Sequence, residues 1–232
     1  MDRRTFESGI SLAWNAVQTL NLGETFSNGG ALEVDTGFRN LILSSDTAYE
    51  DIFLYGLKNS NYNFLLSDHS FFQFSWFKEN DIRFAYYPNP YLGSDANNLL
   101  TYKKRLELFQ SELVDYEEFL QLLGDAVGMG RIPVIRYENA PDQYKEMLHP
   151  CSHLHIGLHG DDRWPVRRIL TPHAFTLIIL RNYYGTIWRE SEVDETGKFL
   201  KLDAELRKAR ATSSILPTEQ FSAPEEGIFH FL

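Results

Sequence analysis

Three short runs of β-forming residues decide the fold; they read YNFLL at 62–66, FFQFSW at 71–76 and IRFAYY at 82–87. Short polar segments separate the three runs. Aromatic and β-branched runs with polar breaks between them predict an antiparallel meander. The prolines of Pro88-Asn89-Pro90 end it, because a proline cannot donate a hydrogen bond to a neighbouring strand.

Further strands are expected downstream. Residues 132–137 read IPVIRY, where Pro133 indicates a sheet edge or a strand start. Residues 138–142 then turn the chain, and residues 164–170 are extended. Together with the meander, these runs predict a central antiparallel sheet of about five or six strands.

Helices are expected where apolar residues recur at steps of three and four. This pattern covers residues 5–20, 45–57 and 99–127. Thr171 and Pro172 begin another helix that runs to Tyr184, since Thr is a good N-cap and Pro suits the first helical position. The fold class is therefore α+β, with helices covering one face of the sheet.

The domain organisation follows from the same pattern. Residues 1–190 would form a single α+β domain, with its sheet at about 62–90 and 131–170. Residues 191–232 are polar and charged and would form a C-terminal extension that adds a last strand or docks on a partner.

The stretch 99–127 carries an apolar heptad stripe from Leu99 to Val127, which predicts one long helix. Such a helix would cover the sheet, because the meander has an apolar face to bury. The alternative is a coiled-coil seam that joins two copies of the chain as a homodimer.

Composition limits the classes of protein. The 232 residues carry a formal net charge of −10 and one cysteine, Cys151. A single cysteine excludes an internal disulfide and suits a reducing cytoplasm. No apolar run has the length of a membrane span. Residues 131–190 differ from the acidic remainder, since they carry eight Lys and Arg against six Asp and Glu.

The histidines are concentrated in this positive part. Four of the seven lie within residues 149–159, which read HPCSHLHIGLH. In a strand, side chains alternate between two faces. Leu154, Ile156 and Leu158 would then point into a core. The opposite face would carry the four histidines and the cysteine, which are His149, Cys151, His153, His155 and His159.

One hypothesis for this strand is metal-free cleavage of RNA. His153 and His155 would act as general base and general acid, and RNA supplies its own 2′-hydroxyl nucleophile. Arg136 and Arg167 would stabilise the negative charge that develops on the phosphate. The substrate-binding contacts would come from Tyr137, which can stack on a base, from Arg168 and from His159.

The second hypothesis is a metal site. His149, His153, His155 and His159 offer nitrogen ligands that suit zinc, with Cys151 nearby as a sulfur ligand. The spacing is not that of a zinc signature, so no cofactor is favoured and zinc is the alternative. Cys151 would be a weak nucleophile, and Asp68 with His69 are best explained as turn residues.

Several segments resemble a family of bacterial proteins catalogued as domain of unknown function 2290. The segments that carry the resemblance are 64–74, 82–90, 153–157 and 167–181. They cover most of the chain, and the resemblance by itself implies no activity.

Residues 62–159 are also similar to the TumE-type toxins of toxin–antitoxin systems. Arg136 through Pro141 read RYENAP, and a proline-led histidine pair follows. The toxins read roughly Arg-Tyr-Asp-Asn-Ala-Pro, followed by a Pro-His-His-x-His run. Glu138 stands where they have Asp, and Cys151-Ser152 replaces their first histidine. This resemblance implies a nucleic-acid-directed toxin that a partner protein neutralises.

The sequence therefore predicts a toxin-like or phage-defence-associated nuclease that cleaves RNA. The alternative is a non-catalytic scaffold or assembly subunit of a defence or toxin–antitoxin complex. In that case the acidic surface and the heptad stripe would hold a protein partner, and the histidines would be structural or would bind a metal.

Overall fold

A computed structural model describes residues 1–92, 96–124, 132–158, 162–191, 201–228, 230 and 231. Its centre is a seven-stranded sheet in which every strand pairs antiparallel with the next strand along the chain. The strands are β1 (Gly23–Phe26), β2 (Phe64–Leu66), β3 (Phe71–Lys78), β4 (Asp81–Tyr87), β5 (Ile135–Asn139), β6 (Ser152–Ile156) and β7 (Trp164–Pro165). The α+β class and the antiparallel meander are confirmed.

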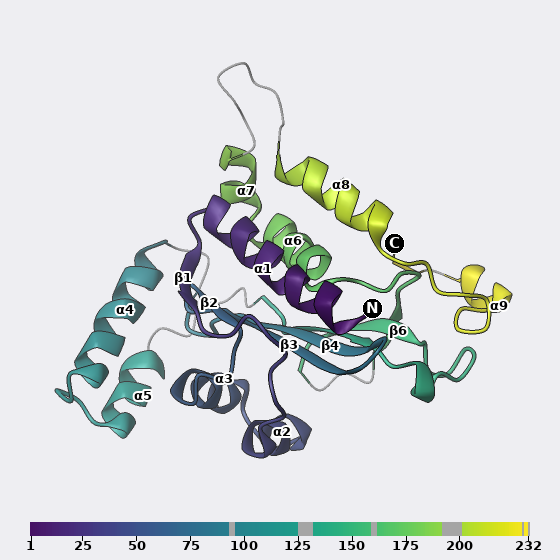
Figure 1. The fold of residues 1–232 in the computed structure, drawn as a ribbon. Coiled ribbons are helices and arrows are strands. Elements are labelled where there is room, and N and C mark those ends of the chain that lie inside the picture. The colour runs from purple at the N-terminus through teal and green to yellow at the C-terminus, as the bar shows by residue number, and fades with distance from the viewer. Residues whose placement is uncertain (93–95, 125–131, 159–161, 192–200, 229, 232) are drawn as a thin grey trace.

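Helices cover both faces of the sheet, whereas the sequence predicted cover on one face (Figure 1). On the first face lie α1 (Arg3–Thr19), α6 (Pro172–Tyr183), α7 (Gly185–Ser191) and α8 (Leu202–Thr212). On the second face lie α2 (Thr36–Leu43), α3 (Tyr49–Lys58), α4 (Ala96–Gln110) and α5 (Tyr116–Gly124). The reason is that β3 and β4 are apolar on both sides, so each face needs a cover.

The two faces bury separate aromatic cores. Phe72, Phe74 and Phe84 pack toward α1 and α6, where Phe175 meets all three rings. Phe71 and Tyr87 point the opposite way and stack on each other under α3. Alternation along β3 and β4 thus fixes which residue serves which core.

Side chains cap the starts of two helices on the first face, and one of these caps was predicted. The side chain of Asp2 accepts a hydrogen bond from the Thr5 amide at the start of α1. Thr171 caps α6 in the same way, with Pro172 in the first turn. The start of α6 is therefore confirmed, and seven of the twelve residues of this helix are buried.

The single long helix predicted over 99–127 is wrong within the described residues. The chain breaks after Gln110, where Glu112 adopts a positive φ of 56°. Asp115 and Glu118 then cap a new helix, α5, each accepting a hydrogen bond from the other's backbone amide. Phe109 stacks on Phe119 and contacts Tyr116, so the two shorter helices pack against each other. The end of the predicted stripe, from 125 to 127, lies outside the described residues.

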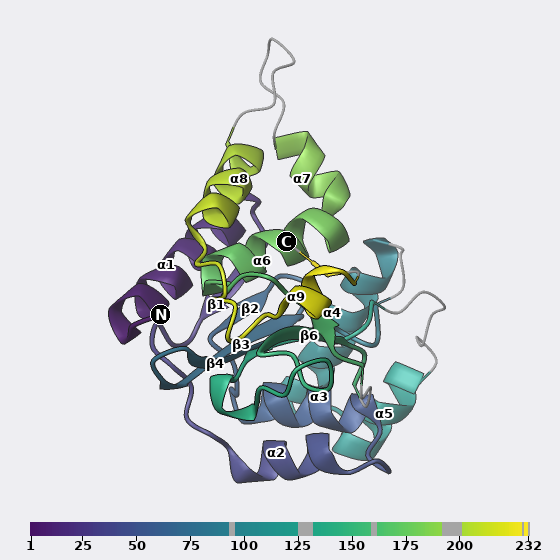
Figure 2. The same ribbon diagram turned by 90° about the vertical axis from the view of Figure 1, so that its right-hand side faces the viewer.

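The C-terminal part packs on the first face. Leu202 and Ala209 of α8 enter the core beside α6. The short helix α9 (Ala223–Glu226) follows, and Phe231 forms a parallel bridge with Val166 next to β7 (Figure 2). The part of residues 191–232 that the structure describes thus contributes to the core. None of the described helices is both long enough and apolar enough to span a membrane.

Candidate metal centre

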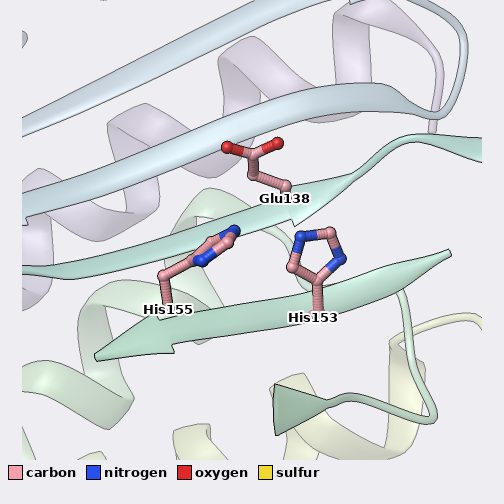
Figure 3. A group of neighbouring side chains, drawn as sticks. All are labelled: Glu138, His153 and His155. Carbon is pink, nitrogen blue, oxygen red and sulfur yellow. The ribbon is translucent and has the colours of Figure 1, made fainter. Parts of the chain in front are cut away.

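The site is built by the pairing of β5 with β6. Glu138 lies opposite His153, and Arg136 lies opposite His155. Directly opposed residues of an antiparallel pair point to the same face. These four side chains therefore project together from the second face of the sheet, beyond the cover of its apolar core. Figure 3 shows the two imidazoles and the carboxylate gathered on one side of the two strands.

Three of these groups can reach one ion. One ligand atom each from Glu138, His153 and His155 lies within 4.8 Å of the others. The ring centroids of His153 and His155 are 4.8 Å apart, and His149 lies 5.1 Å from His153 on the other side. The histidines form a row, and Glu138 closes it from the neighbouring strand.

The cluster is buried. His153 is 0% exposed and His155 is 6% exposed, whereas Ile156 on the opposite face is 38% exposed. The sequence predicted that Ile156 would point into the core, and that prediction is wrong at this position. It is wrong because β6 lies next to the end of the sheet, where the first-face core no longer covers Ile156 but the second face encloses the histidines.

His153 is held in one orientation. Its Nδ1 lies 2.9 Å from the carbonyl oxygen of Pro150, which can only accept, so Nδ1 carries the proton. Nε2 then keeps its lone pair, and this atom is buried with no hydrogen-bond partner among the described residues. Burial, with a smaller contribution from His155, lowers the pKa of His153 to about 3. The imidazole is therefore neutral at pH 7.

Two arginines flank the cluster. Arg136 donates from Nη2 to the carbonyl oxygen of Leu158 at 3.3 Å, while its Nε is buried and has no partner in the part of the chain that the structure describes. On β4, Arg83 pairs with Glu138 at 3.4 Å. Arg83, Arg136 and Glu138 also form one wall of a groove of about 240 Å³ that runs over the second face to α2. The cluster therefore borders an open groove whose described lining holds three arginines and three carboxylates.

Other residues predicted for the site lie elsewhere. Arg167 pairs with Glu226 at 2.8 Å, donates to the carbonyl oxygen of Leu216 and stacks over Phe221. It is thus engaged by the C-terminal segment and is not placed to contact a phosphate at the histidines. Arg168 donates to the carbonyl oxygen of Ser213 at 2.8 Å on the first face. His159 lies outside the described residues.

Tyr137 is not available for stacking on a base. It is 0% exposed and points into the first-face core. Its hydroxyl lies 2.8 Å from the hydroxyl of Ser152 and accepts a hydrogen bond from the amide of Leu170 at 2.9 Å. Alternation places Tyr137 opposite to Arg136 and Glu138, so its role is to fix the strands beneath the site.

Cys151 is likewise separated from the histidines. It is buried in the first-face core, and burial raises the pKa of its thiol to about 12. It is therefore neither a nucleophile nor a ligand of this cluster. Asp68 is a turn residue as predicted, since it accepts from the amide of Ser70 at 2.9 Å, and it also accepts from the hydroxyl of Tyr184 at 2.7 Å.

Sequence reasoning missed Glu138 as a site residue. It was placed in a turn, but β5 continues through Asn139. The alternation of Arg136 and Glu138 was the available signal, because it matches the His-x-His alternation of β6. Arg83 was missed because only the sheet register brings β4 beside β5.

Among the comparisons with known proteins, one family profile matches this chain. No curated protein and no solved structure matches this chain, so the similarity to TumE-type toxins has no support beyond its motif. Residues 24–232 match the profile of an uncharacterized conserved protein family, which agrees with the resemblance seen in the sequence. The chain belongs to this family, DUF2290.

Proposed function

We propose that Glu138, His153 and His155 bind a divalent transition-metal ion and that the protein is a metal-dependent phosphodiesterase acting on RNA. One observation carries the proposal. The Nε2 lone pair of His153 is buried without a hydrogen-bond partner among the described residues, beside a second imidazole and a carboxylate. A buried polar atom without a partner costs free energy, and a metal ion at this position would satisfy it.

The donor set fits such an ion. Two imidazoles and one carboxylate are the protein ligands of several catalytic zinc sites, which keep a further position open. The hydrogen bond from Nδ1 of His153 to the Pro150 carbonyl has the form usual for metal-binding histidines, because it fixes the ring and its tautomer. Zn–N bonds of about 2.0–2.1 Å would require the three ligand atoms to move closer together than 4.8 Å.

The low pKa of His153 separates this proposal from metal-free acid–base chemistry. A general acid must hold a proton at the working pH, and an efficient general base needs a pKa near that pH. With a pKa of about 3, His153 has no proton on Nε2 to give at pH 7 and is a weak proton acceptor. A neutral, oriented imidazole is instead the state that coordinates a metal.

The groove beside the cluster supports a phosphate-containing substrate. Arg136 and Arg83 adjoin Glu138, and Arg39 of α2 lines the same groove. Arginine forms paired hydrogen bonds with phosphate oxygens and stabilises charge that develops on them. Phe77, which is 43% exposed and lies under the Arg83 guanidinium at 5.1 Å, offers an aromatic surface for an unpaired base.

A bound divalent metal would polarise the phosphate or activate a water molecule. The residues of this chain would then have distinct tasks. His153, His155 and Glu138 would hold the ion, and Arg136 would orient the phosphodiester at the mouth of the groove. Glu138 would also keep Arg83 directed toward the groove. The toxin or phage-defence setting stays a prediction.

The test is cleavage of a labelled single-stranded RNA by the purified chain. The chain is stripped with EDTA and assayed with and without Zn²⁺ or Mn²⁺, together with His153→Gln and Glu138→Gln. His173→Gln is the matched control, since His173 is a half-buried histidine paired with Glu205 on the first face.

The expected result is cleavage that needs added metal, is lost in both site variants and is retained in the control. Cleavage that persists in EDTA would contradict the metal-dependent mechanism and return His155 to acid–base chemistry. Metal binding without cleavage would support the metal site but contradict the proposed nuclease activity, and the protein would then be a non-catalytic metal-binding subunit.

A further inference from the structure

A second cationic site lies on the opposite face of the sheet. A cavity of about 240 Å³ opens between α6 and α8, and four arginines line it: Arg168, Arg181, Arg207 and Arg210. They come from three parts of the chain, namely the strand segment before α6, the end of α6 and the second half of α8. The whole chain has a net charge of −10, so this convergence is not the average surface of the protein.

The positive charge of the four arginines is only partly balanced by acidic side chains in the cavity. Among the described residues that line it, Asp203 is the one acidic side chain. Its Oδ1 already accepts from Nε of Arg181 at 3.3 Å and from Nε1 of Trp188 at 3.2 Å. Within the part of the chain that the structure describes, no acidic side chain pairs with Arg168, Arg207 or Arg210.

One hydrogen bond anchors the Arg168 side chain in the lining of the cavity. Its Nη1 donates to the carbonyl oxygen of Ser213 at 2.8 Å, at the end of α8. Its Nε is buried and has no partner among the described residues. A guanidinium with one donor anchored and another left over is suited to bind an anion.

The rest of the lining is apolar. Leu170, Ala174, Ile178 and Leu206 form the inner surface between the two helices. A fitting ligand therefore combines a strongly anionic group with a small apolar body. A nucleic-acid backbone would instead need an extended positive surface, and the acidic Glu205 lies on the same helix, two residues before Arg207.

We propose that the cavity between α6 and α8 binds a small phosphorylated molecule, with its phosphate held by Arg168, Arg207 and Arg210. Arg181 is retained by Asp203 and closes the rim. The site is separate from the metal centre, because the sheet lies between the face that carries α6 and α8 and the face that carries Glu138 and His153. It does not depend on the proposed nuclease activity.

The experiment is a calorimetric titration of EDTA-treated protein with phenyl phosphate, inorganic phosphate, phenol and a short single-stranded RNA. The variants are Arg207→Gln/Arg210→Gln and Arg168→Lys, which keeps the charge but removes the planar donor set. Lys208→Gln is the matched control, because it removes one exposed positive charge from α8 and does not line the cavity. His153→Gln tests independence from the metal centre, and melting temperatures check folding.

The proposal expects saturable binding of phenyl phosphate, weaker binding of inorganic phosphate and none of phenol. Affinity should fall at least about tenfold in the double variant and in Arg168→Lys, while Lys208→Gln and His153→Gln should bind like the wild type. Failure of both phosphates to bind, equal loss in Lys208→Gln, or loss in His153→Gln would overturn it. Binding of RNA alone would overturn it in favour of a nucleic-acid surface.

Discussion

Glu138 of β5 lies directly opposite His153 of β6, and both side chains point to the second face of the sheet. This cross-strand pairing places a carboxylate beside a buried imidazole whose outer nitrogen has no hydrogen-bond partner among the described residues. The register of two strands is therefore sufficient to assemble three ligands. A shift by one residue would move each strand's polar set to the other face and destroy the site.

Removing the carboxylate should weaken metal binding. In Glu138→Gln one charged ligand becomes a neutral amide, and we expect the affinity for Zn²⁺ to fall by about 100-fold or more. Arg83 would also lose its partner, but this pair is half-exposed on the arginine side and should contribute no more than about 1 kcal/mol to stability. Competition against a metal-binding dye measures the affinity, and unchanged affinity would remove Glu138 from the ligand set.

Removing the arginine beside the cluster should separate binding of the ion from turnover. In Arg136→Gln the metal ligands remain, whereas the proposed contact to the phosphate is lost. We expect cleavage of RNA to slow by about 100-fold with unchanged affinity for Zn²⁺. Arg39→Gln, at the far wall of the same groove, should have a smaller effect. Equal rates for wild type and Arg136→Gln would show that this guanidinium does not act on the substrate.

A substitution at Tyr137 distinguishes a structural role of this residue from a role in substrate binding. Tyr137→Phe deletes a buried hydroxyl that bonds Ser152 and the amide of Leu170. The Ser152 hydroxyl keeps its bond to the Arg168 carbonyl oxygen, but the amide of Leu170 is left unpaired, which should lower the free energy of unfolding by about 1–3 kcal/mol in urea titrations. Affinity for RNA should stay the same, since the ring does not reach the surface. A loss of RNA affinity without loss of stability would reverse this assignment.

His69 should make stability depend on pH. Burial, followed by the nearby charge of Lys103, lowers its pKa to about 4 from an ordinary value of 6.5, with a smaller opposing effect of Glu24. Below pH 6.5 the unfolded chain takes up a proton that the folded chain does not. The free energy of unfolding should therefore fall by about 1.4 kcal/mol per pH unit from pH 6.5 towards pH 4 on account of this residue.

The variant His69→Asn isolates this contribution. Asparagine tolerates the positive φ of 64° at this position and does not titrate in the range. The difference in unfolding free energy between wild type and variant should shrink or reverse as the pH falls. A difference that stays constant between pH 4 and pH 7 would mean that His69 is protonated equally in both states.

Part of this architecture could be read from the sequence. The meander runs and the Thr171-Pro172 helix start are local signals, and each held because a local rule of turn or cap chemistry decides it. The heptad stripe predicted one long helix, and this prediction was wrong. Asp115 and Glu118 cap a second helix within the stripe, so two shorter helices share one continuous apolar pattern. His153 and His155 were found because their spacing lies within one strand.

The remainder of the site depends on pairing between strands. Arg83 and Glu138 come from β4 and β5, which are far apart in sequence. No periodicity within either segment reports which residues of the other it will meet. Arg167 and Arg168 lie near the histidines in sequence but are bound by the C-terminal segment. Proximity along the chain was therefore a poor guide to these two residues.

The most direct test of the central claim is a calorimetric titration of the metal-free chain with Zn²⁺, performed on the wild type and on His153→Gln. The account predicts one site per chain in the wild type and an affinity at least about 100-fold lower in the variant, with both proteins folded. Absence of binding to the wild type, or equal binding by the two proteins, would contradict it.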